Sequence, residues 1–280
     1  MVFVPRSVTI STLPSVVNET WAGSASAPLS GRVESGSAVS FPSARWNPLM
    51  LGVPLLSTYT SEPLTAIPAS TRELSSADAD PAQVSFTTDG TVLIVTERGT
   101  DTISSYLIDE RGYAQGPATV KSSGQTPYGF GLTADGSLIV SEAFGGAAGA
   151  AATSSYAVSG AGELTMLSGS VGDTRSEVCW VALTKDDRFA YVTNFGDGTV
   201  SCYEITADRS LRLHEPVAGS TRQGEKGIRD EAISGDGRYL YAIDADAQKL
   251  FGWVVGQGGQ LTPVGEFGGV PGTVAGLAAS

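Results

Sequence analysis

The chain has 280 residues, enough for one large domain or two ordinary ones with a substantial core. Charged residues make up only 16% of it and there are 35 glycines, a composition that favours strands joined by tight turns. The formal net charge is -12 and no cluster of Lys and Arg is present, so neither nucleic acid nor an anionic membrane surface is expected as a partner.

Residues 1–54 carry no repeated pattern and no Asp-Gly turn. We expect a degenerate copy of the repeat described below, or an N-terminal part that is truncated or altered. The apolar stretch near Leu49 is far shorter than the ~20 residues of a membrane helix. Pro5 and Pro14 interrupt the region where a signal peptide would have its apolar core, so the sequence predicts a cytoplasmic protein.

From residue 55 onward the chain is dominated by a repeat of about 50 residues, with clear units that start near residues 81, 127, 178 and 228. Each unit reads as a strand, a tight turn, a second strand, a polar loop, usually a third strand, and a last apolar segment. The turn aspartates are Asp89, Asp135, Asp186 and Asp236. Four antiparallel strands in such a unit are typical of a β-propeller blade, which buries its faces by stacking against other blades.

The repeat therefore predicts an all-β fold in which residues 55–280 form a β-propeller, with about four clear blades and partial segments at both ends. A β-sandwich is the weaker alternative, because four successive units share one spacing and one turn chemistry. Near the end, the segment 271–279 contains PGTVAGLA and matches the pattern of a first strand. We expect this segment to be a closing strand that completes a blade begun by the N-terminal part.

Cys179 and Cys202 are the only cysteines. They fall on the first and third predicted strands of one sheet, roughly 9 to 10 Å apart, too far for a disulfide. We expect two small buried residues. The only histidine, His214, falls on an outer strand and is expected to be exposed, so no triad that uses histidine can form near the axis.

The segment RFAYVTNFGDGTVSCYEI, from Arg188, resembles the YVTN-type repeat of the seven-bladed β-propeller lactonase family, which includes 6-phosphogluconolactonase and the fungal carboxymuconate lactonizing enzyme. The segment from Ala77 to Tyr106 looks similar to the bacterial branch of that family. The resemblance covers residues 55–280. It implies seven blades in an intact member, activity toward lactones, no required metal or cofactor, and arginine, histidine and glutamate near the axis.

One departure concerns the start of a blade, where many members of that family have Pro-Arg-His. Aligned through the turn, this sequence has Val178, Cys179 and Trp180 at that place. The inherited reaction therefore cannot be transferred residue by residue.

Propeller geometry selects candidate site residues without an alignment, because the loop that enters the first strand and the loop that leaves the second strand lie on one face. Residues leaving the second strand are Glu97, Glu142, Asn194 and Asp244, with Arg98 and Asp246 close by. Residues entering the first strand are Gln83, Tyr128, Arg175, Glu177, Arg229, Asp230 and Glu231. Together they predict a polar, mostly acidic ring around a central funnel.

The chemistry expected there is hydrolysis, or formation, of a small anionic lactone. Glu177 or Glu231 would act as the base, with a pKa raised by neighbouring carboxylates and burial, and Arg175 and Arg229 would hold the anionic group. The residues expected to contact substrate are Glu97, Arg98, Tyr128, Glu142, Asn194 and Asp244.

Three alternatives stay open at this stage. The polar residues that follow the second strands could cap loops rather than bind a ligand. The propeller could be non-catalytic and bind a small ligand or a protein partner. The oxygens around the axis could hold Ca²⁺, as in gluconolactonase-like propellers that depend on a metal. In each case the Gly-rich stretch from Ser141 to Tyr156 is expected to form a flexible insertion at the funnel rim.

Overall fold

The computed structural model describes residues 72–272, 274 and 276–279, and the expectations placed on residues 1–71 lie outside this range. The described part is almost entirely β-structure. Its strands and one short 3-10 helix are β1 (Pro81–Phe86), β2 (Val92–Glu97), β3 (Thr102–Ile108), β4 (Ala114–Lys121), β5 (Pro127–Leu132), β6 (Leu138–Glu142), η4 (Phe144–Gly146), β7 (Ala152–Val158), β8 (Leu164–Gly172), β9 (Val178–Leu183), β10 (Phe189–Asn194), β11 (Thr199–Ile205), β12 (Leu211–Ser220), β13 (Ile228–Ile233), β14 (Tyr239–Asp244), β15 (Lys249–Val255) and β16 (Leu261–Gly268).

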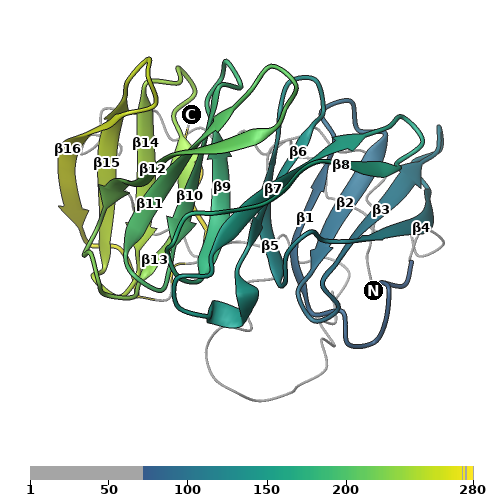
Figure 1. The fold of residues 1–280 in the computed structure, drawn as a ribbon, viewed down its shortest axis with the longest axis horizontal. Coiled ribbons are helices and arrows are strands. Elements are labelled where there is room, and N and C mark those ends of the chain that lie inside the picture. The colour runs from purple at the N-terminus through teal and green to yellow at the C-terminus, as the bar shows by residue number, and fades with distance from the viewer. Residues whose placement is uncertain (1–71, 273, 275, 280) are drawn as a thin grey trace, which may run out of the picture.

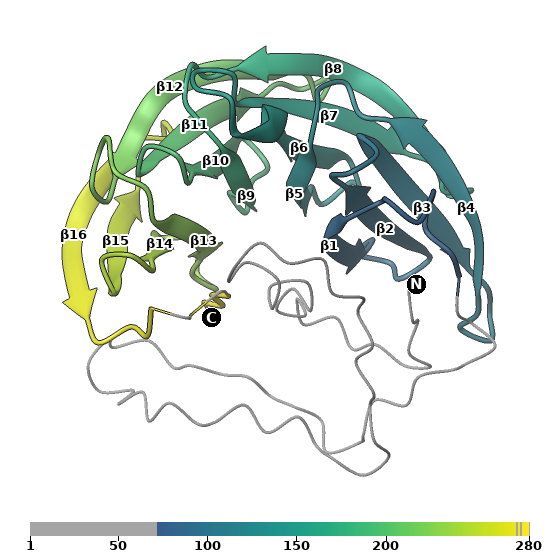
Figure 2. The same cartoon turned by 90° about the horizontal axis from the view of Figure 1, so that it is seen from below.

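These strands form four antiparallel sheets, each built from four strands that are consecutive in the sequence (Figure 1). We call them blade 1 (β1–β4), blade 2 (β5–β8), blade 3 (β9–β12) and blade 4 (β13–β16). Figure 2 shows the blades side by side in an arc, with β1, β5, β9 and β13 on the concave side and β4, β8, β12 and β16 along the convex rim. The prediction of an all-β propeller with four clear blades is confirmed.

The turn between the first two strands of each blade is organised by its aspartate, as the repeat predicted. In blade 2, Thr133 Oγ1 donates to Asp135 Oδ1 at 2.5 Å, and the N–H of Ser137 donates to the same oxygen at 3.2 Å. The equivalent aspartates in the other blades make the same pair of contacts; they are Asp89, Asp186 and Asp236. These side chains replace the backbone partners that a tight turn lacks.

The cores lie between neighbouring blades. Ile94 and Phe130 belong to the cluster between blades 1 and 2, Val192 belongs to the next cluster, and Leu240 and Trp253 belong to the cluster between blades 3 and 4. Strands β2 and β10 are buried along their whole length because both of their faces are covered. Burying several large side chains per interface, at about 1.5–3 kcal/mol each, is what holds blades together.

A repeated hydroxyl group also ties each inner strand to the preceding blade. The next-to-last residue of the second strand in blades 1 to 3 donates a hydrogen bond to a carbonyl oxygen of the next inner strand: Thr96 to Tyr128 at 2.5 Å, Ser141 to Cys179 at 2.5 Å, and Thr193 to Arg229 at 2.7 Å. Blade 4 has Ile243 at this place, and Ile243 packs instead in an apolar cluster with Val270 and Leu277.

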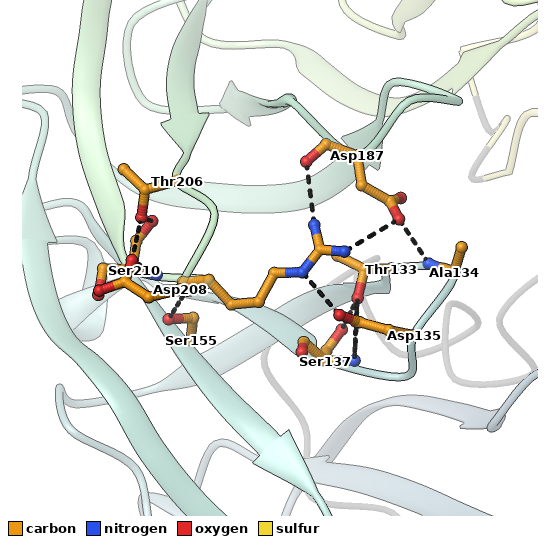
Figure 3. A network of polar contacts seen from close by, with 10 residues as sticks. Thr133, Ala134, Asp135, Ser137, Ser155, Asp187, Thr206, Asp208 and Ser210 are labelled. Carbon is orange, nitrogen blue, oxygen red and sulfur yellow. Dashed lines mark hydrogen bonds and ion pairs between the residues drawn. The ribbon is translucent and has the colours of Figure 1, made fainter.

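Arg209 links blade 3 to blade 2 on the face that carries the tight turns between the first and second strands. Its Nε lies 2.8 Å from Asp135 Oδ2, and its Nη2 lies 3.6 Å from Asp187 Oδ2. Ser155 of blade 2 donates to the carbonyl oxygen of Arg209 at 2.7 Å. Figure 3 shows the two aspartates and Ser155 converging on this joint from the two blades.

The described residues of the expected closing segment 271–279 are not in a strand. Val274 and Leu277 instead contact the apolar cluster of blade 4, and the N–H of Leu277 donates to Asp230 Oδ2 at 2.7 Å. The partner expected for this strand belongs to the N-terminal part, outside the described residues. The closing strand stays a prediction.

Both cysteines are buried and free, Cys179 on β9 and Cys202 on β11, as expected. His214 is exposed on the outer strand β12, where its ring lies 5.3 Å from the ring of Phe189. Among the residues that the structure describes, no helix has the length and apolar character needed to cross a bilayer. The cellular location stays a prediction.

Candidate functional site

Every inner strand has a β-bulge near its start, and these bulges build the wall nearest the axis. In blade 1 the pairing runs from Pro81 opposite Glu97 to Val84 opposite Val95, so residues 82 and 83 together face only Thr96. The same irregularity recurs at residues 128–129, 179–180 and 229–230. We call these four pairs the axial wall. Bulges re-aim side chains, and here they turn the start of each inner strand toward its neighbours on the concave side.

In blades 1 to 3 the hydroxyl opposite the bulge accepts a hydrogen bond from a backbone N–H of the bulge. In blade 2 the N–H of Gly129 donates to Ser141 Oγ at 2.9 Å, and this hydroxyl in turn contacts the carbonyl oxygen of Cys179. The extra residue would otherwise leave an N–H without a ladder partner. One side chain therefore satisfies the bulge of its own blade and fixes the bulge of the next one.

The middle of the axial wall is aromatic. Tyr128 and Trp180 meet edge to face, with ring centroids 5.4 Å apart, and they belong to one cluster with Ala82, Cys179 and Phe195. An edge-to-face pair of this kind contributes about 0.5–1.5 kcal/mol beyond its buried area. The cluster spans blades 1 to 3 and gives this part of the wall a fixed shape.

Arg98 lies against this aromatic cluster. Its guanidinium carbon is 5.2 Å from the centroid of the Tyr128 ring, and its Nη2 lies 2.8 Å from Asp80 Oδ1. Asp80 directly precedes β1, and Arg98 directly follows β2. The sequence analysis placed Arg98 and Tyr128 in the site, and the structure brings these two side chains together.

Electrostatics show that several candidate residues converge near one point. The pKa of the Cys179 thiol is raised to about 12, chiefly by burial and then by the charge of Glu177, while the charges of Arg98 and Arg229 oppose the rise. A charge affects a pKa in this way only when it lies nearby. Arg98 of blade 1, Glu177 of blade 3 and Arg229 of blade 4 thus each lie near Cys179 of the axial wall.

Glu177 lies at the entrance to β9 and is mostly buried. Its Oε2 lies 2.9 Å from Lys226 Nζ, and that ammonium group is also 5.6 Å from the centroid of Phe195. The backbone of Glu177 has a φ of 57°, and the equivalent residues before the other inner strands share this feature, with φ of 44° at Asp80, 57° at Thr126 and 138° at Gly227. The positive φ is therefore part of the blade connection and not a strain peculiar to one residue.

Arg229 and Arg175 differ in how they are held. Arg229 lies in the bulge of β13, and no hydrogen bond or ion pair of its guanidinium group is present among the described residues. Arg175 lies on the connection into β9, where its Nη2 donates to Thr174 Oγ1 at 3.1 Å and its Nε is buried without a partner in the described part of the chain. Arg229 is therefore the more available cation.

Glu231 does not lie where the sequence analysis expected it. It follows the bulge and pairs with Ala242, and its carboxyl group points toward β9 in the interface between blades 3 and 4. No hydrogen bond of ordinary geometry reaches either carboxyl oxygen among the described residues, although the N–H of Ala182 on β9 is near enough to oppose the rise of the pKa. Burial, and then Asp230, raise the pKa of Glu231 well above its usual range.

Asp230 is a member of the axial wall whose carboxyl group is already occupied. It accepts hydrogen bonds from its neighbour, the N–H of Glu231, at 2.9 Å, and from the N–H of Leu277 at 2.7 Å. Burial raises the pKa of Asp230 to about 7. This carboxyl group anchors the C-terminal segment next to blade 4.

The four polar residues that end the second strands are completely buried and face the loops of their own blades; they are Glu97, Glu142, Asn194 and Asp244. Glu97 accepts from Ser104 Oγ at 2.6 Å and from the N–H of Ser75 at 3.2 Å. Glu142 accepts from the N–H of Gly124 at 2.8 Å. Ser75 and Gly124 lie on the connections that enter the same blades, so each carboxylate holds an incoming connection in place.

Asp244 holds the incoming connection of blade 4 in place in the same way. It accepts from the N–H of Ala247 at 2.8 Å, and its Oδ1 lies 3.1 Å from Arg222 Nη2 on the connection that enters β13. This geometry favours the loop-capping alternative for the four residues over direct contact with a ligand. Their role as substrate contacts stays a prediction.

In blade 3 the strand and the incoming connection are also joined by hydrogen bonds, but the carboxylate lies on the connection instead of the strand. The strand ends in an amide, Asn194, and the incoming connection supplies the carboxylate, Asp173. Ser201 lies between them, with its Oγ 2.8 Å from both Asn194 Nδ2 and Asp173 Oδ2. Burial raises the pKa of Asp173 to about 6.

Comparison with known proteins identifies the family to which the chain belongs. The sequence profile described as Lactonase, 7-bladed beta-propeller matches residues 57–143 and 143–274. The chain belongs to the seven-bladed β-propeller lactonase family. No curated protein matches the sequence. The resemblance inferred from the repeat is thereby confirmed.

Solved structures show the same fold at low identity. A periplasmic gluconolactonase of Pseudomonas aeruginosa is 19% identical, with a TM-score of 0.59 over 69% of this chain and 58% of that one. A putative 6-phosphogluconolactonase of Bacteroides fragilis is 17% identical, with a TM-score of 0.59 over 73% of this chain and 60% of that one. A protein of Lactobacillus plantarum is 20% identical, with a TM-score of 0.56 over 68% of this chain and 56% of that one. This member of the family therefore spans less than two thirds of the length of these proteins.

Sequence reasoning missed two residues of the site in this lactonase-family protein, Asp80 and Lys226. Both form ion pairs with predicted residues, Asp80 with Arg98 and Lys226 with Glu177. The repeat contained a signal for one of them, because Asp80 stands one residue before its inner strand, as Glu177 does. Lys226 gave no such signal, since it comes from the connection to the following blade.

Two observations limit other kinds of site in the described part of the chain. Within it, no group of three or more His, Cys, Asp or Glu residues is placed to hold a metal ion, so the calcium alternative gains no support there. A hollow of about 520 Å³ lies on the opposite, turn-bearing face of blade 3. Its charged lining is balanced between three acids and three arginines: Asp186, Asp187, Glu204, Arg188, Arg209 and Arg212.

Proposed function

We propose that this protein hydrolyses a small anionic lactone at the axial wall, with Glu177 as the base and Arg98 and Arg229 holding the anionic group. The family supports lactonase-type activity in general, and the convergence of these three residues on the surroundings of Cys179 supports this place for it. That convergence is the observation on which the proposal rests, since it joins groups from three blades.

The reaction needs a base, an attacking water and a proton donor for the leaving oxygen. Glu177 takes a proton from a water molecule as the water oxygen forms a bond to the lactone carbonyl carbon. The ring C–O bond then breaks, and the protonated Glu177 returns its proton to the leaving alkoxide, which yields a hydroxy acid. Lys226, whose Nζ lies 2.9 Å from Glu177 Oε2, stabilises the negative charge that develops on the carbonyl oxygen.

Glu231 is not part of this proposal, because it lies in the interface between blades 3 and 4. Arg175 is a further cation that could bind the anionic group, since only one hydrogen bond, to Thr174, holds its Nη2 among the described residues. The reaction as written uses no metal or cofactor.

The test is a panel of lactones assayed by proton release, with and without EDTA. We expect hydrolysis that EDTA does not change, a loss of about a hundredfold or more in kcat for Glu177→Gln, and a raised KM for Arg229→Ala. Glu163→Gln, an exposed acid on the turn-bearing face, is the matched control for Glu177→Gln. Activity that survives Glu177→Gln, or that EDTA removes, would contradict the proposal.

A second candidate is a non-catalytic propeller that binds a small ligand. Two observations favour it: Cys179 and Trp180 occupy the place of the Pro-Arg-His stretch, and Lys226 already pairs with Glu177. In that case no lactone of the panel is hydrolysed, while a carboxylate ligand still raises the thermal midpoint of unfolding.

A further inference from the structure

The contacts of the axial wall form a chain of side chains that ends at a guanidinium group. Trp180 of blade 3 meets the edge of Tyr128 in blade 2, at 5.4 Å between centroids, and Arg98 of blade 1 lies over the Tyr128 ring at 5.2 Å. Three blades thus contribute one side chain each. Only Arg98, the last of the three, carries a charge.

The contact between Trp180 and Tyr128 depends on a glycine in β5. A Cβ at Gly129 would lie 2.5 Å from the carbonyl oxygen of Cys179 and 3.0 Å from Trp180 Cε3, closer than real contacts allow. Gly129 therefore lets the indole lie against the backbone of the neighbouring inner strand. No other residue type leaves this space.

The guanidinium group of Arg98 has two contacts, one with the Tyr128 ring and one with Asp80. The Tyr128 ring supports one side of the guanidinium group, and Asp80 lies 2.8 Å from its Nη2. A free arginine side chain would lose about 2 kcal/mol of conformational entropy when it is fixed by a ligand. Most of this cost is met in the folded protein before a ligand arrives, because the side chain is already ordered.

The charges at this place suit a ligand with a single negative charge. The charge of Asp80 offsets that of Arg98, and Arg229 has no ion pair among the described residues. Arg98 thus offers a fixed geometry and Arg229 offers the uncompensated charge. A carboxylate matches the planar fork of a guanidinium group and brings one charge, whereas a phosphate ester brings nearly two.

We propose that Trp180 is a positioning residue that acts through Tyr128 on Arg98, and that this arrangement selects lactones that carry one carboxylate. The inference rests on the proposed function and names its substrate class. Trp180 itself does not touch the reacting atoms. Its effect is on the binding of the charged group.

The test compares two γ-butyrolactones that differ in one ring substituent, a carboxylate in one and a methyl group of similar size in the other. In the wild-type protein we expect the carboxylate-bearing lactone to have the lower KM. For Trp180→Phe and for Arg98→Gln we expect the ratio of the charged to the uncharged KM to rise about tenfold, which corresponds to about 1.4 kcal/mol of lost binding.

A matched control separates positioning from folding. Trp253→Phe makes the same change in the core between blades 3 and 4, and we expect it to leave the KM ratio as in the wild type. The double variant Trp180→Phe/Arg98→Gln should show little more effect than Arg98→Gln alone, because both changes disable one anchor. Thermal midpoints are measured for all variants.

Binding of tetrahydrofuran carboxylate, a cyclic ether that cannot be hydrolysed, distinguishes failure of the inference from failure of the proposed function. If no lactone is hydrolysed but the ether carboxylate binds and Trp180→Phe weakens it about tenfold, the inference stands and the proposed function fails. Hydrolysis with equal KM for both lactones, a preference for a phosphorylated lactone, or additive effects in the double variant would overturn the inference. So would an ether carboxylate that fails to bind the wild-type protein.

Discussion

The Nε atom of Arg209 lies 2.8 Å from Asp135 Oδ2, and this ion pair joins the β11–β12 turn of blade 3 to the β5–β6 turn of blade 2. Arg209 has a φ of 64°, and the equivalent residue of each other blade is a glycine with a φ of 79–81°: Gly112, Gly162 and Gly259. An arginine at this place costs about 1 kcal/mol of backbone strain relative to glycine. The contacts of its side chain compensate for that strain.

Replacing Arg209 should separate the two effects. We expect Arg209→Ala to lower the free energy of unfolding by about 1–2 kcal/mol, because it keeps the strain and loses the contacts to Asp135 and Asp187. Arg209→Gly should be about 1 kcal/mol less damaging, because it removes the strain. Urea denaturation measures both. Arg111→Ala, at an exposed arginine of blade 1, is the control, and equal values for the Ala and Gly variants would count against the strain argument.

Glu231 should be a liability to stability at neutral pH. Its carboxyl group is buried without a hydrogen bond of ordinary geometry in the described part of the chain, and the equivalent residues of blades 1 and 3 are Val84 and Val181. We therefore expect Glu231→Val to raise the free energy of unfolding by about 1–3 kcal/mol near pH 8. Chemical denaturation checks this, with Glu163→Val as an exposed control. A destabilised Glu231→Val protein would show that the carboxyl group has a partner after all.

Stability should also fall as the pH rises from about 5 to 8. Burial raises the pKa of Asp173 to about 6, of Asp230 to about 7, and of Glu231 well above its usual range. The folded state binds these protons more tightly than the unfolded state, so their stabilising effect is complete below the unfolded pKa values and is lost as the pH rises through the folded ones. The slope reaches about 1.4 kcal/mol per pH unit for each group.

This pH dependence is measured as the free energy of unfolding in urea at several pH values. The double variant Asp173→Asn/Glu231→Val should flatten most of it. The turn aspartates Asp89 and Asp236 act in the opposite sense at lower pH, since hydrogen bonds from Thr87 and Ser234 lower their pKa values. A protein as stable at pH 8 as at pH 5 would refute the burial argument.

The fold could be predicted from the sequence because one signal is repeated four times. Asp135 and its equivalents mark the tight turns, and the alternating strands on either side fix the start of each blade. Each blade is a local unit, so its strand order follows from short connections. The closing strand expected at 271–279 stays a prediction, because its expected partner lies outside the described residues.

The site was less accessible to sequence reasoning because it depends on contacts between blades. Arg98 and Tyr128 were found from their place at strand ends, but their contact to each other comes from the bulge at Tyr128 and from the stacking of two blades. Glu231 was misplaced for the same reason, since the bulge shifts the side-chain alternation by one residue. Periodicity within a strand cannot reveal such a shift.

The exchanged pair of blade 3 gives the last prediction. In blade 2 a carboxylate, Glu142, accepts from Ser122 Oγ of the incoming connection at 2.9 Å, whereas in blade 3 the amide Asn194 and the acid Asp173 share Ser201. Asn194→Asp places a second acid in this buried space. We expect the free energy of unfolding at neutral pH to fall by about 2–4 kcal/mol, because neither charge gains a cation to compensate.

Asn194→Glu should cause a similar loss, and restoring the blade 2 arrangement should reduce it. The double variant Asn194→Glu/Asp173→Ser puts the acid back on the strand and a hydroxyl donor on the connection, as Glu142 and Ser122 are arranged. Because the two positions act on one network, their effects should be strongly non-additive, with the double variant at least about 1 kcal/mol more stable than Asn194→Glu alone. Denaturation of the wild type, both single variants and the double variant gives the four free energies of unfolding that the double-mutant cycle needs. Additive effects would mean that Asn194 and Asp173 are independent, and the exchange would then be a coincidence of the two blades.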